Sequence, residues 1–166
     1  MRIANEYNHL NALEYLIVRK EALYHEIIDC ITCVNANHFQ KISADKSRLG
    51  EVIYDQVGIN SAIKENMSNF LWDDKRIDYF VTDEEETTRE LINIHDRDEQ
   101  RRILGEKGLP AYSTYNQVDF QKDRVAVEVQ LGKYFSVTYD LHVKHTFFYS
   151  RNDIDVGIEI IPTKAI

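Results

Sequence analysis

Asp119, Glu128 and Gln130 are the residues whose types and spacing best suit chemistry on a phosphate ester. Glu128 and Gln130 lie two residues apart in the alternating run 125–131, so a strand there points both side chains to one face and the apolar ones to the other. Asp119 ends a preceding apolar run, and the polar residues 121–123 between the two runs predict a hairpin turn. The sequence therefore predicts that Asp119 lies beside Glu128.

Two carboxylates that converge from adjacent strands repel each other, so they either raise one another's pKa or recruit a cation. Mg²⁺ prefers one or two carboxylates and keeps several waters, which suits a site that must activate water and polarise a phosphate. We therefore predict that Asp119 and Glu128 bind Mg²⁺ and that the amide of Gln130 holds a water or a phosphate oxygen. The alternative is an ordinary hairpin whose polar side chains face solvent.

Length and composition favour one globular domain over residues 1–166, which is enough chain to bury a sizeable core. An apolar leader is absent, as is any apolar run of about 18 residues, so we expect a cytoplasmic protein with no membrane segment. The net charge of −8 argues against a general nucleic-acid binder. However, residues 101–166 hold nine basic and eight acidic residues, which leaves 11 basic and 20 acidic residues for 1–100. The acidity is therefore mostly N-terminal.

The spacing of apolar residues predicts further helices and strands around the hairpin. We expect helices over residues 20–34, 59–72, 84–94, 96–107 and 137–149, strands over residues 2–7, 76–82 and 154–161, and a loop at 43–47. In the second helix, Asn60 or Ser61 is the expected cap, and the expected inward side chains are Ile63, Met67, Phe70 and Leu71. Together these predict an α/β fold with a mixed central β-sheet flanked by helices and the site on an edge hairpin.

Two other pairs of residues have spacings that can bind metal. Cys30 and Cys33 form a Cys-x-x-Cys pair, but they lie inside an apolar helical pattern without a second ligand pair, which favours reduced helix residues over zinc or redox chemistry. His142 and His145 lie three apart on one predicted helix face without a nearby third ligand. For these histidines we favour polar contacts to solvent or phosphate.

The hairpin also resembles a known family. Asp119, followed nine residues later by Glu128-Val129-Gln130, resembles the Asp and Glu-x-Gln variant of the PD-(D/E)xK signature in type II restriction endonucleases of the BglII and BstYI group. The resemblance covers nearly the whole chain: it is strong over residues 1–3, 9–15, 113–134, 139–145 and 154–160, and weakest over about 83–107.

The resemblance implies a restriction-endonuclease-like core and a Mg²⁺-dependent endodeoxyribonuclease that cuts duplex DNA at a GATC-centred palindrome as a homodimer. In this role Asp119 and Glu128 hold the metal, and Gln130, in place of the more common Lys, orients the attacking water. Lys133 stands where family members reach bases or backbone, with a solvated surface lysine as the alternative. The resemblance further implies that the chain ending at Ile166 lacks a strand and a helix present in relatives.

Two other functions stay open from the sequence. One is a catalytically idle DNA-binding or assembly protein on a nuclease core, which would gain nothing from Mg²⁺. The other is a repair or recombination nuclease of the same superfamily, which would prefer branched DNA to linear palindromes.

Overall fold

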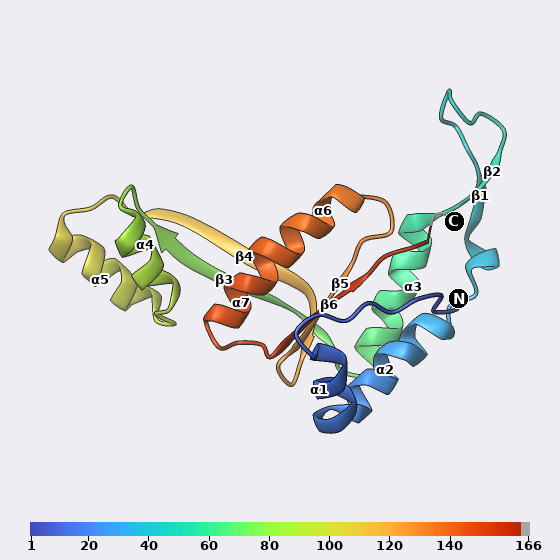
Figure 1. Cartoon of the computed structure of the whole chain (residues 1–166). Coiled ribbons are helices and arrows are strands. Elements are labelled where there is room, and N and C mark those ends of the chain that lie inside the picture. The colour runs from blue at the N-terminus through green and yellow to red at the C-terminus, as the bar shows by residue number, and fades with distance from the viewer. Residues whose placement is uncertain (164–166) are drawn as a thin grey trace. The chain divides into compact units, whose positions relative to one another are not determined.

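The computed structural model describes residues 1–163 as an α/β fold (Figure 1). The α-helices are α1 (Ala12–Arg19), α2 (Glu21–Thr32), α3 (Gln56–Asn69), α4 (Glu85–Ile92), α5 (Arg97–Lys107), α6 (Tyr134–Tyr139) and α7 (Thr146–Ser150). A 3-10 helix spans Ala36–Phe39 and a π-helix spans Asp140–His145. The strands are β1 (Gln40–Ile42), β2 (Val52–Tyr54), β3 (Asp73–Val81), β4 (Tyr112–Lys122), β5 (Val125–Val129) and β6 (Val156–Ile160).

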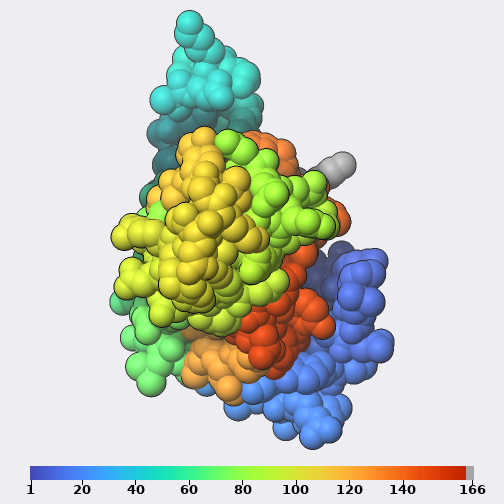
Figure 2. All heavy atoms as spheres, turned by 90° about the vertical axis from the view of Figure 1, so that its left-hand side faces the viewer, coloured from blue at the N-terminus to red at the C-terminus, as the bar shows by residue number. Residues whose placement is uncertain are grey.

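The chain divides into two compact units. The first unit contains residues 1–73, 129–134 and the chain from 159, and the second unit contains residues 74–128 and 135–158. The first unit holds α1, α2, α3 and the two-stranded β1-β2 ribbon, whereas the second holds α4, α5, α7 and the β4-β5 hairpin. Figure 2 shows the face of the second unit on which α4 and α5 are exposed.

A four-stranded sheet in the order β3-β4-β5-β6 contains the predicted hairpin. β4 and β5 are antiparallel, and their register pairs Phe120 with Val127. The turn consists of Asp123 and Arg124, whose φ angles of 42° and 67° suit a two-residue hairpin turn. The predicted turn at 121–123 was therefore misplaced, because β4 continues in paired conformation to Lys122.

The core of the first unit is formed by apolar faces of its helices. The buried side chains include Leu16, Leu23, Ile27, Ile59, Ile63, Met67 and Trp72. The indole Nε1 of Trp72 donates a hydrogen bond of 2.8 Å to Glu26 Oε2, so this large side chain is buried with its polar group satisfied.

Three predictions about the first unit were wrong in detail. The helix predicted over 59–72 begins earlier, after Asp55, and ends at Asn69. Phe70 and Leu71 therefore follow the helix and are exposed, and Leu71 has a positive φ of 64°. Residues 2–7 form no strand, although the amino group of Met1 donates to the carbonyl oxygens of Thr32 and Val34. Alternation of apolar residues does not make a strand where no neighbouring strand supplies hydrogen bonds.

The core of the second unit packs helix residues on the sheet. Buried Tyr79, Val118 and Ala126 from the strands contact Phe147 and Phe148 of α7. A second cluster joins β3 to α4 and α5 through Phe80, Leu91 and Leu104.

Both charged helices predicted in the second unit are confirmed, and their ends follow from the sequence. Asp96 caps α5 by accepting a hydrogen bond of 2.8 Å from the N–H of Asp98, and Gly108 ends it with a φ of 65°. Buried Gln100 accepts from the N–H of Phe80 at 2.9 Å and donates to the carbonyl of Leu91 at 2.9 Å, which fixes α5 to its neighbours. None of the helices described over residues 1–163 is long and apolar enough to span a membrane.

Candidate active site

Asp119 and Glu128 lie on the two strands of the β4-β5 hairpin, Asp119 one residue before Phe120 and Glu128 one residue after Val127, the residue paired with Phe120. The negative charge of Asp119 acts on Glu128, so the two carboxylates lie near each other. The hairpin therefore brings together the two carboxylates that the sequence pointed to.

The two carboxylates differ in their access to water. Glu128 is fully buried, at 0% exposure, whereas Asp119 is exposed. Burial, together with the nearby negative charge of Asp119, raises the pKa of Glu128 to about 8, although Lys144 acts in the opposite direction. A buried carboxylate next to a second carboxylate is a costly arrangement, which is typical of functional sites rather than of packing.

Lys144 and Asp140 complete the polar cluster around Glu128. Nζ of Lys144 lies 2.9 Å from Oε1 of Glu128 and 2.8 Å from Oδ1 of Asp140. Asp140 is 1% exposed and Lys144 is about one-fifth exposed. Burial lowers the pKa of Lys144, but its hydrogen bonds to Asp140 and Glu128 outweigh this effect, so the ammonium stays protonated.

The π-helix places Lys144 and Asp140 in this cluster. The helix predicted over 137–149 is found as one helical stretch from Tyr134 to Ser150, but its middle turns, Asp140–His145, are π-helical. Insertions of this kind are rare and often occur at functional sites. Sequence reasoning assigned no role to Asp140 or Lys144, although their spacing of four on a predicted helix was a signal that they could pair.

Gln130 and Lys133 belong to the first unit and follow β5. The N–H of Gln130 donates a hydrogen bond of 2.9 Å to the carbonyl of Ile160, and its side chain is half-buried. Lys133 is exposed. The roles predicted for these two residues stay predictions.

The carboxylates that the hairpin brings together fit a hard divalent cation. Oε2 of Glu128 is buried and accepts no hydrogen bond from any residue between 1 and 163, and Asp119 is exposed. Two carboxylates and several waters are the usual ligands of Mg²⁺ in proteins. Within the described chain, no group of three or more His, Cys, Asp and Glu residues could hold a metal ion, so ligand sets of the zinc type are not formed there.

The cysteine and histidine pairs do not form an alternative metal site. Cys30 is buried and Cys33 exposed, and burial raises the pKa of the Cys30 thiol to about 11, so it stays protonated. His142 is exposed, whereas His145 is buried against Gly157, where a Cβ would lie 1.4 Å from Nδ1 of His145. The prediction that His145 contacts solvent is therefore wrong, because the helix turns its ring toward β6.

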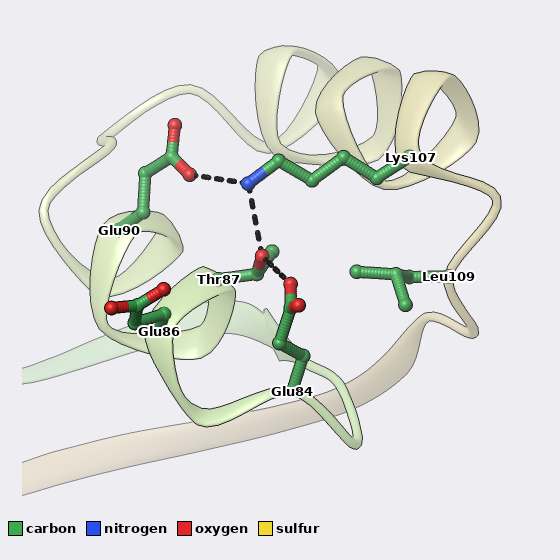
Figure 3. Close-up of a pocket in the computed structure, with 6 residues that line it drawn as sticks. All are labelled: Glu84, Glu86, Thr87, Glu90, Lys107 and Leu109. Carbon is green, nitrogen blue, oxygen red and sulfur yellow. Dashed lines mark hydrogen bonds and ion pairs between the residues drawn. The ribbon is translucent and has the colours of Figure 1, made fainter.

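A separate surface hollow of about 610 Å³ lies at α4 and the end of α5 (Figure 3). Its lining residues are Glu84, Glu86, Thr87, Glu90, Lys107 and Leu109. Lys107 crosses the hollow and donates to Glu90 at 2.8 Å and to Thr87 at 2.9 Å, so its charge is already paired (Figure 3). Neither hairpin carboxylate lines this hollow.

The fold is that of the restriction endonucleases. The structure is similar to the crystal structure of restriction endonuclease BglII complexed with a DNA 16-mer, with a TM-score of 0.54 and 23% sequence identity. The match covers 93% of this chain and 55% of the BglII chain, so this chain spans about half the length of that protein. This similarity confirms the predicted α/β fold class.

The sequence identifies the family within that class. The sequence model of the family described as restriction endonuclease BglII/BglIII matches residues 4–166. The chain therefore belongs to the BglII/BglIII restriction endonuclease family, which confirms the family resemblance predicted from the sequence. A search of curated proteins gives no match.

Proposed function

We propose that this protein is a Mg²⁺-dependent type II endodeoxyribonuclease that hydrolyses a phosphodiester bond in duplex DNA. The observation that carries the proposal is the buried Glu128 carboxylate near Asp119, with Oε2 of Glu128 accepting no hydrogen bond within residues 1–163. Family membership supports the same reaction. Toward a phosphate the carboxylate pair needs a cation, because two negative charges alone repel the phosphate.

In this proposal Asp119 and Glu128 hold the cation, which, when bound, lowers the pKa of a water and polarises the phosphoryl oxygen. Hydrolysis of a phosphate ester requires a barrier lowering of about 20 kcal/mol, so positioning must supplement the metal. Gln130, two residues after Glu128, orients the attacking water by its amide. An amide carries no charge, so Gln130 does not itself lower the pKa of that water.

The proposed target is a palindrome with a GATC core, cut on both strands by a homodimer. The experiment that tests the proposed function is incubation of the protein with plasmid DNA and Mg²⁺, followed by sequencing of the ends. Ends that share one GATC-centred palindrome support it. A preference for branched junctions would favour a repair or recombination nuclease instead, and DNA binding that gains nothing from Mg²⁺ would favour a catalytically idle protein.

We expect two chains to bind one duplex, because a protein that cuts both strands of a palindrome must match its two-fold symmetry. The helical stretch after β5 offers a surface for this dimer, since it exposes large apolar side chains: Phe135, Tyr139, Leu141 and Val143. Phe135→Glu should raise the dimer dissociation constant about tenfold or more, because it places a charge in an apolar contact. Analytical ultracentrifugation with and without a palindromic duplex measures this.

Leu49→Glu is the matched control for the dimer experiment, since Leu49 is 74% exposed and lies between β1 and β2 rather than on α6. It should leave the dimer unchanged. A persistent one-to-one complex of wild-type protein with cognate duplex would contradict the proposed dimer.

Lys133→Ala should alter which bases are accepted and cost about 1–3 kcal/mol at one position of the target, if Lys133 donates to guanine O6 and N7. Its exposed side chain is free of burial constraints and can reach a duplex. Binding of Lys133→Ala to duplexes that differ at single positions, compared with wild type, tests this. An equal loss on specific and random duplexes would mean that Lys133 contacts phosphate instead.

A further inference from the structure

The ammonium of Lys144 lies between two buried carboxylates in the way that a bridging cation does. Nζ of Lys144 is 2.9 Å from Oε1 of Glu128 and 2.8 Å from Oδ1 of Asp140, which are charge-assisted hydrogen bonds of full strength. The two carboxylates are 0% and 1% exposed. When both buried carboxyl groups are ionised, a positive charge between them stabilises the pair, and either an ammonium or a metal ion can supply it.

Glu128 is the carboxylate that connects this bridge to the hairpin. Its Oε1 faces Lys144, while its Oε2 is buried without a hydrogen-bond partner among residues 1–163. Asp119 lies on β4, and its negative charge acts on Glu128. The polar cluster thus has two positions for a positive charge: one between Asp119 and Glu128, and one between Glu128 and Asp140.

We propose that the active site takes one divalent cation, held by Asp119 and Glu128, and that the ammonium of Lys144 occupies the position between Glu128 and Asp140 where a second cation would otherwise bind. Two-metal sites hold their ions about 3.5–4 Å apart. Glu128 belongs to both positions here, because its Oε1 lies 2.9 Å from Nζ of Lys144 and the charge of Asp119 acts on it. The proposal rests on the proposed function, since it concerns the metal of the same site.

The π-helix gives this arrangement a structural cause. Asp140 and Lys144 both lie in the π-helical turns, so the carboxylate and the ammonium that it binds are delivered to Glu128 by one element. The ammonium has three donors, of which the two carboxylates take two. The fixed single positive charge of Lys144 offsets one of the two negative charges of Glu128 and Asp140 and fills the position without a second metal.

Counting the ions bound to the metal-free protein tests the proposal without any measurement of cleavage. Mn²⁺ serves as the probe, and its stoichiometry is measured by titration calorimetry in the absence of DNA. The wild-type chain should bind one ion. Lys144→Ala should bind two, because removal of the ammonium opens the position between Glu128 and Asp140. The double variant Lys144→Ala with Asp140→Asn should return to one ion, since the second position then has lost a carboxylate.

Lys144→Ala removes the positive charge that lies between two buried carboxylates and can unfold in chelator, so its circular dichroism is followed as well. If Lys144→Ala unfolds in chelator, Mn²⁺ should restore its helical circular dichroism signal with two ions bound per chain. The double variant should need less Mn²⁺ to fold. Two ions on the wild-type chain, one ion on Lys144→Ala, or failure of Lys144→Ala to fold in excess Mn²⁺ would overturn the inference. No ion on the wild-type chain would instead contradict the proposed function.

Discussion

Glu128→Ala and Asp119→Ala should abolish DNA cleavage, with a fall in rate of more than about 10³-fold, because each removes a carboxylate that the proposed metal needs. Loss of a single hydrogen-bond donor to a transition state already costs about 10²–10³-fold in other enzymes. Removal of a metal ligand should cost more. The rate is measured with an end-labelled palindromic duplex in saturating Mg²⁺, under single-turnover conditions so that product release does not contribute.

The same two variants should bind DNA in chelator at least as tightly as the wild-type protein. A carboxylate near the scissile phosphate repels it until a cation intervenes, so its removal relieves that repulsion.

Gln130→Ala should keep part of the cleavage activity, because an orienting amide contributes less than a metal ligand. Asp83→Ala is the matched control, since Asp83 is an exposed carboxylate of the second unit outside the hairpin, and it should leave cleavage unchanged.

Glu128→Gln is expected to stabilise the metal-free protein by a few kcal/mol at pH 8 and above. Glu128 is fully buried beside other carboxylates, and its pKa is raised from 4.5 to about 8. Gln has nearly the same shape, and its amide oxygen can still accept the hydrogen bond from Lys144. Replacement therefore removes a buried negative charge without leaving a cavity.

The pH dependence of this effect has a definite sign. Between pH 4.5 and about 8 the folded protein keeps the proton on Glu128 while the unfolded chain has lost it, so the free energy of unfolding falls as pH rises. The slope from this group is at most about 1.4 kcal/mol per pH unit. Glu128→Gln lacks this slope, so the difference between variant and wild type should grow from pH 5 to pH 8 and then level off. Urea denaturation in chelator at several pH values measures it.

Addition of Mg²⁺ provides the control for the stability experiment. Mg²⁺ should raise the free energy of unfolding of the wild-type protein and have less effect on Glu128→Gln, because ligand binding stabilises only the folded state that binds it. A wild-type protein that is more stable than Glu128→Gln in chelator at pH 8.5 would show that the buried carboxylate contributes to folding rather than to the metal site.

The hairpin and its carboxylates were predictable because strand periodicity is local. The alternation of apolar and polar residues along 125–131 predicts the face of the sheet to which Glu128 points. The short polar turn before this strand predicts that Asp119, on the preceding strand, lies beside Glu128. The turn itself was misplaced, since Asp123 and Arg124 adopt positive φ without the Gly that usually marks such turns. The local sequence pattern therefore predicted that the two strands pair, but it did not predict which residues form the turn.

Lys144 and Asp140 could not be assigned to the site from the sequence, because their contacts with Glu128 depend on how the helix packs on the sheet. The spacing of apolar residues in this sequence does not distinguish a π-helical turn from an α-helical turn. The burial of His145 depends in the same way on a tertiary contact, the absence of a side chain at Gly157. Phe70 and Leu71 were expected inside as part of the inward face of a helix over 59–72, yet α3 ends before them.

The central claim, that the hairpin carboxylates form the active site of a metal-dependent DNA nuclease, is tested most directly on supercoiled plasmid. Wild-type protein and Glu128→Ala are compared in Mg²⁺ and in chelator, and nicked and linear products are counted. The wild-type protein should linearise the plasmid in Mg²⁺ and not in chelator, and Glu128→Ala should do neither. Full cleavage by Glu128→Ala in Mg²⁺ would contradict the account.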